Sequence, residues 1–141
     1  MIFAHQSREQ LRQAWRESWR RRVDGLPLEP LQAQIADVIA LHPEYHAFIL
    51  QDDSAVLDFT PEGGRENPFL HLGLHLALHE QIGTDRPPGI AAEFQRLSRR
   101  AGDAHAAEHQ MIEVLATLLW ESQRSGRAAD AQRYLERLRR L

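Results

Sequence analysis

The chain lacks cysteine and lysine. The absence of cysteine limits the kinds of catalytic and metal-binding site that the chain can form. With no cysteine among its 141 residues, disulfides, a catalytic thiol, thiolate zinc sites and iron–sulfur clusters are excluded. Any bound metal must therefore be held by nitrogen and oxygen ligands. The absence of lysine makes all 17 basic residues arginine, a bias that we attribute to genomic base composition.

Long apolar runs are missing as well. Residues Met1 to His5 lead straight into a charged segment that begins at Ser7, which leaves no apolar stretch of signal-peptide length. No run elsewhere approaches the roughly 20 apolar residues of a membrane span. We therefore expect a cytoplasmic protein with no membrane partner.

The arginines do not form an isolated basic patch. They cluster at 20–22, 99–100 and 133–140, but acidic residues lie close to each cluster and no ladder of aromatic residues interleaves them. Surfaces that bind nucleic acid usually combine a patch of basic residues with interleaved aromatic residues. We predict solvated helix faces and no nucleic-acid partner, and nothing indicates an organic cofactor. Self-association and binding to another protein both stay open.

Turn and capping residues, including a capping box at Ser7 and Gln10 and N-caps at Asn67 and Asp103, divide the chain into about six to seven helices. Period-two alternation is essentially absent, which predicts an all-α fold. The length fits a single domain over residues 1–141, an antiparallel helical bundle with short connections. Residues 51–66 are expected to form an irregular surface loop with a short extended piece at Ala55–Phe59. The expected helices are Ser7–Arg22, Leu31–Leu41, Pro43–Leu50, Pro68–Ile82 (ended by Gly83), Ile90–Arg100, Ala104–Ser125 and a last one between Asp130 and Leu141.

The histidines recur at a spacing of four residues, which stacks side chains on one helical face and lets two imidazoles share a metal ion. In a helical projection of about 100° per residue, these sets lie on or beside the apolar stripes, toward the core. The same projection puts Glu108 at the centre of the stripe of the longest helix, where an unpaired carboxylate costs several kcal/mol. The sets are His42/His46, His71/His75/His79 and His105/His109.

Chain direction predicts that these sets converge. If successive helices run antiparallel, the helices that begin at Pro68 and Ala104 run parallel, because one helix separates them. The histidines of both lie near the start of each helix and thus at one end of the bundle. His42 and His46 join them if the second helix descends to that end.

Two interpretations of the buried imidazoles stay open. In the first, they bind a divalent transition metal, namely zinc, iron, manganese or nickel. The segment His105-Ala-Ala-Glu-His109 has the form H-x-x-E-H, in which Glu108 would serve as general base for metal-assisted hydrolysis. In the second, the chain is a non-enzymatic interaction protein with a metal-free histidine and glutamate network inside. The candidate ligands are His71, His75, His105 and His109, with Glu108, His46 and His42 as further ligands or orienting partners.

Four segments of the chain, 28–46, 67–75, 85–90 and 105–124, resemble the bacterial domain-of-unknown-function 1841 family. The resemblance covers nearly the whole chain. It implies a small proteobacterial protein of uncharacterised activity, so no catalytic role is carried over. The family pattern often has arginine at the position of His79, which makes His79 the least expected ligand of its helix, and His5 is given no role.

Overall fold

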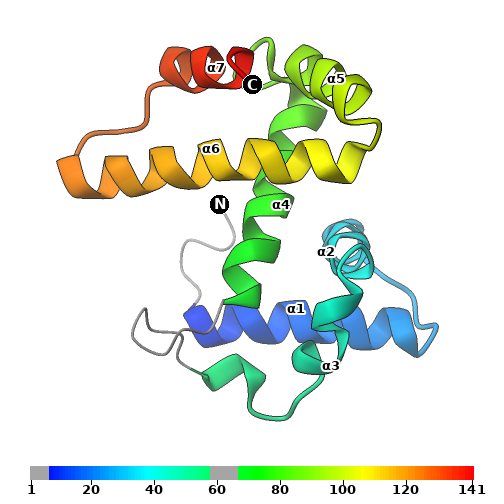
Figure 1. The fold of residues 1–141 in the computed structure, drawn as a ribbon. Coiled ribbons are helices and arrows are strands. Elements are labelled where there is room, and N and C mark those ends of the chain that lie inside the picture. The colour runs from blue at the N-terminus through cyan, green and yellow to red at the C-terminus, as the bar shows by residue number, and fades with distance from the viewer. Residues whose placement is uncertain (1–6, 58–66) are drawn as a thin grey trace. The chain divides into compact units, whose positions relative to one another are not determined.

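Figure 1 shows the fold as a computed structural model, which describes residues 7–57 and 67–141. In these ranges the chain is helical and has no strand, so the predicted all-α fold is confirmed. None of these helices has the length and apolar character needed to cross a membrane. The elements are α1 (Arg8–Val23), α2 (Pro30–Ala40), η2 (Pro43–Tyr45), α3 (His46–Ile49), η3 (Ser54–Val56), α4 (Pro68–Thr84), α5 (Ile90–Ala101), α6 (Ala104–Ser125) and α7 (Ala131–Arg139), where η marks a 3₁₀ helix.

The chain divides into two compact units, residues 1–72 (unit 1) and residues 73–141 (unit 2). The division falls inside α4, so the first residues of this helix belong to unit 1 and the remainder to unit 2. Each unit has its own internal packing. The single domain and the antiparallel bundle expected from the sequence stay predictions.

Helices α1 and α4 each begin at a residue whose side chain caps the helix. The Ser7 hydroxyl accepts a hydrogen bond from the Gln10 backbone, and the Gln10 side chain accepts one from the Ser7 backbone, so the expected capping box is present. The Asn67 side chain accepts from the backbone of Phe69 at 3.0 Å at the start of α4. Pro43 begins a new short helix, which is one of the two outcomes that proline allows there.

Two local predictions are wrong. Gly83 does not end α4, which continues to Thr84; Asp85 takes the left-handed conformation instead, with φ 50°. Its carboxylate accepts backbone hydrogen bonds from Gly89 and from Ala91 in the first turn of α5, which compensates for that conformation. The extended piece at Ala55–Phe59 is also wrong where it is described, because Ala55 lies in η3. The rest of that segment, from residue 58, lies outside the described residues.

Unit 1 is organised around two buried arginines of α1, Arg12 and Arg16. The Arg12 guanidinium donates to the carbonyl of Leu57 at 2.7 Å and lies over the Phe69 ring, 5.0 Å from its centroid. Arg16 Nε donates to the carbonyl of Ile49 at 3.0 Å. Since helix ends leave carbonyls without intrahelical partners, these arginines fasten α1 to the ends of α3 and η3.

The apolar core of unit 2 is built by α4, α5, α6 and α7, with α5 and α7 both packed against α6. In Figure 1 α6 is the longest of these helices. Ala107 and Met111 of α6 are part of this core, together with Leu78 of α4. The core residues are Leu78, Ile90, Leu97, Ala107, Met111, Ile112, Leu115, Leu118, Tyr134, Leu135 and Leu138.

Tyr134 provides a prediction for alkaline pH. Its hydroxyl donates to the Gln81 side chain at 2.9 Å, and burial raises the pKa of the phenol above its usual value. The neutral phenol therefore contributes stability that is complete below about pH 10 and is lost as the pH rises toward the folded-state pKa. Because the chain has no lysine to titrate there, urea unfolding measured at a series of alkaline pH values should show this loss. Tyr134→Phe should reduce the slope, and an unchanged slope contradicts the assignment.

Candidate metal centre

Five side chains from two helices lie together in unit 2, and we call them the His/Glu cluster. Helix α4 contributes His75 and His79, which are one turn apart. Helix α6 contributes His105, Glu108 and His109 from its first two turns. Four imidazoles and one carboxylate thus come from segments about thirty residues apart in the chain.

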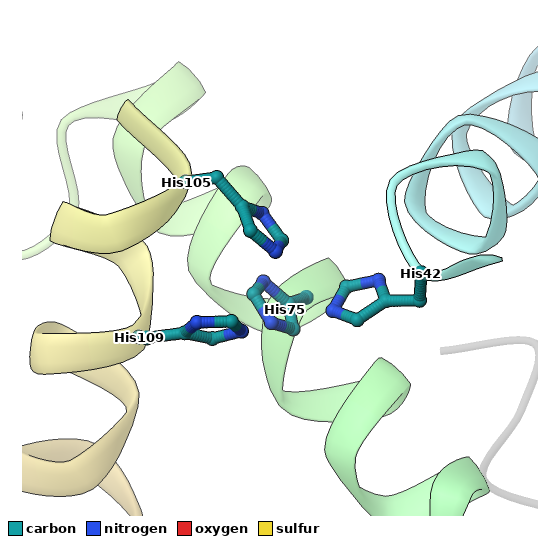
Figure 2. A group of neighbouring side chains, drawn as sticks. All are labelled: His42, His75, His105 and His109. Carbon is teal, nitrogen blue, oxygen red and sulfur yellow. The ribbon is translucent and has the colours of Figure 1, made fainter. Parts of the chain in front are cut away.

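Three imidazoles of the cluster face one another, as Figure 2 shows for His75, His105 and His109. Their ligand nitrogens all lie within 4.8 Å of one another. The rings of His75 and His105 stack with 6° between their planes, and the His109 ring stands edge-on to both. Two nitrogens that share a zinc ion at about 2.0–2.1 Å each are at most about 4.2 Å apart. Small side-chain movements therefore suffice to close these three nitrogens on one ion.

Glu108 is the only carboxylate of the cluster, and it is buried, with 4% of its surface exposed. Its Oε1 contacts His79 Nε2 directly and lies 3.8 Å from His75 Nδ1. Its Oε2 lies 3.7 Å from His105 Nδ1. The two oxygens of one carboxylate therefore face three imidazoles.

These imidazoles decide the charge of Glu108. Burial by itself raises the pKa of a carboxyl group, because it disfavours the ionised form. The direct contact with His79, the nearby His75 imidazole and the positive charge of both outweigh burial and lower the pKa of Glu108 to about 2. The carboxylate is therefore ionised at neutral pH. Histidine provides the cation or donor that a buried carboxylate needs.

The cluster forms where α4 and α6 cross. In Figure 1 the two helices lie across each other, so the prediction that they run parallel is wrong. Irregular residues 85–89 and 102–103 separate α5 from α4 and from α6. Crossed helices touch over only a few turns, and the inward-facing histidines of both helices fall on that contact.

His42 and His71, also predicted as ligands, lie in unit 1. His42 is buried, and its Nδ1 donates to the carbonyl of Val38 at 2.8 Å. The rings of His42 and His71 meet edge to face, with centroids 5.1 Å apart. The sequence therefore predicted the burial of His42 correctly, whereas His71 is only partly buried; within unit 1 the two are neighbours.

His46, the last predicted ligand, has a structural role in unit 1. Its Nε2 donates to the carbonyl of Ile39 at 2.8 Å, which joins α3 to the end of α2. Its ring packs on Trp19 of α1, with centroids 4.4 Å apart. One ring nitrogen is thus committed to a backbone carbonyl.

His79 is the member of the cluster that sequence reasoning ranked last on α4. Four residues turn an α-helix by about 400°, so each step of the histidine series rotates the side chain by about 40°. His79 therefore stands only about 40° from His75, and the structure places it against Glu108. The sequence signal that identifies His79 is this small angle to His75, the middle histidine of the series. The angle to His71 does not identify it.

A family model, Domain of unknown function (DUF1841), matches residues 7–140 of the chain. Comparison with curated proteins and with solved structures finds no match. The matched residues include all of α1 to α7 and every member of the His/Glu cluster, so the resemblance of the four sequence segments is confirmed. The chain belongs to the DUF1841 family.

Proposed function

We propose that the protein binds a divalent transition metal in unit 2, through His75, His105 and His109. The observation that carries the proposal is the approach of three ligand nitrogens within 4.8 Å of one another beside a buried, ionised carboxylate. A cation placed there gains three imidazole ligands and lies next to a compensating negative charge.

The ligand set favours a particular class of ion. Imidazole suits zinc, iron and nickel, whereas all-oxygen sites suit magnesium and calcium. Three protein ligands leave a coordination position for water or another small ligand, as in catalytic zinc sites. We therefore assign the site to zinc, iron, nickel or manganese, with zinc the ion to test first.

Glu108 acts in this proposal as an orienting residue. It faces Nδ1 of both His75 and His105, and a carboxylate at one ring nitrogen fixes the ring so that the opposite nitrogen binds metal. A general base works best with a pKa near the operating pH, and the pKa of Glu108 is about 2. The lowered pKa does not favour Glu108 as the base for metal-assisted hydrolysis, which stays a prediction.

The alternative is a metal-free polar network in a protein that acts through its surface. The direct contact between His79 and Glu108 favours it, because this pair alone gives the buried carboxylate a partner. The two proposals differ in what the removal of a cluster histidine does to metal binding.

Competition for Zn²⁺ with a chromophoric chelator tests the metal proposal. His109→Ala should weaken Zn²⁺ binding by more than about 100-fold, because loss of a ligand exceeds the 10–100-fold effect of an outer partner. His46→Gln is the control, since glutamine keeps a donor for the Ile39 carbonyl, and it should bind like the parent. Equal affinity of His109→Ala and the parent contradicts the proposal.

The cap of α6 gives a second prediction. Asp103 accepts hydrogen bonds from the backbone of His105 and Ala106 in the first turn. Asp103→Ala should cost about 1 kcal/mol of stability and should weaken Zn²⁺ binding by loosening the turn that carries His105. Asp130→Ala removes the equivalent cap of α7 and should lower stability in urea unfolding without changing Zn²⁺ affinity. Equal Zn²⁺ affinities in both variants contradict the coupling.

A further inference from the structure

We propose that unit 2 holds a second divalent ion beside the first, bound by His79 and by Oε1 of Glu108, so that the Glu108 carboxylate bridges two metal positions. The proposal rests on the metal site proposed above. It adds a second position and gives Glu108 the role of a ligand when both ions are bound.

The cluster contains a second set of ligand atoms. His75, His79 and Glu108 offer ligand atoms that also lie within 4.8 Å of one another. This set shares only His75 with the three-histidine position. Two overlapping sets on one pair of helices are what a pair of adjacent ions requires.

The carboxylate is oriented for a bridge. Oε1 of Glu108 faces His79 and His75, whereas Oε2 faces His105. Each oxygen thus points to a different end of the cluster. Two-metal centres hold their ions about 3.5–4 Å apart, and a carboxylate with one oxygen on each ion spans such a separation.

The two positions differ in ligands and in access to water. If His75 serves the three-histidine position, the second position has one imidazole and one carboxylate oxygen from the protein. The His79 side chain is 37% exposed, so water can complete the coordination there. Oxygen-rich sites accept manganese and iron as well as zinc, and with fewer protein ligands we expect this position to bind its ion more weakly than the first.

Substitutions at His79 separate metal binding from charge pairing. In His79→Arg the guanidinium still pairs with the Glu108 carboxylate, but it carries no ligand for a metal. His79→Gln removes the imidazole without adding charge. Because His79 is partly exposed, both variants should keep the helical circular dichroism of the parent.

Native mass spectrometry of the full chain with added Zn²⁺ counts the ions directly. The parent and the control His46→Gln should bind two ions, the two His79 variants one, and His109→Ala at most one. A parent that binds a single ion overturns the second position; if His109→Ala loses that ion, the first position stands. A parent that binds none overturns both positions. Two ions, or none, in both His79 variants would also overturn the assignment of the second ion to His79.

Discussion

His75→Ala is expected to remove Zn²⁺ binding at the three-histidine position, with the largest loss of Zn²⁺ affinity of any single substitution. His75 contributes to both sets of ligand atoms, and it is fully buried at the crossing of α4 and α6. Without it, the three-histidine position keeps only His105 and His109, a pair of imidazoles on one helix. We expect a loss beyond the 10–100-fold typical of an outer partner, measured by Zn²⁺ competition with a chromophoric chelator.

The matched control for this experiment is His71→Ala. His71 stands one turn before His75 on α4, but it belongs to unit 1. We do not assign it as a metal ligand. The account predicts that His71→Ala keeps the Zn²⁺ affinity of the parent. Equal losses in the two variants would contradict a site built within unit 2, and so would full affinity in His75→Ala.

Met111→Ala is expected to give the largest loss of folding stability, about 3 kcal/mol within the 2–5 kcal/mol range of such core truncations. Met111 is fully buried in the core of unit 2 and is one turn beyond the His/Glu cluster on α6. Its removal leaves a cavity between α6 and its neighbours. Urea unfolding with chelator present measures the effect, because bound metal would otherwise add stability of its own.

Met111→Leu is the control for the cavity. It nearly conserves side-chain volume and should cost less than about 1.5 kcal/mol. A loss below about 1 kcal/mol in Met111→Ala would mean that this part of α6 is not packed as described. Comparable losses in the two variants would show that volume is not the cause.

The helices and the residues at which they begin could be predicted from the sequence, because capping acts over three or four residues. Ser7, Asn67, Asp103 and Asp130 each accept a backbone hydrogen bond at the start of the helix where they were expected. The end of α4 could not be predicted, since Asp85 adopts a positive φ that glycine usually supplies. That outcome depends on its hydrogen bonds to the following turn.

The members of the candidate site were only partly predictable. Helical periodicity gives the direction of each side chain around its own axis, and this identified His75, His105, His109 and Glu108 as inward-facing. It carries no information on the angle at which two helices cross, so the site was expected at one end of parallel helices. It also does not show which of two neighbouring turns meets the carboxylate, so the contact between His79 and Glu108 was not predicted.

Elemental analysis of the untagged protein tests the central claim most directly, after purification without immobilised-metal columns or chelators and dialysis against Zn²⁺. The account predicts at least one equivalent of transition metal per chain in the parent and a lower metal content in His75→Ala. Less than about a tenth of an equivalent in the parent, unchanged by dialysis against Zn²⁺, would contradict a metal centre at the His/Glu cluster.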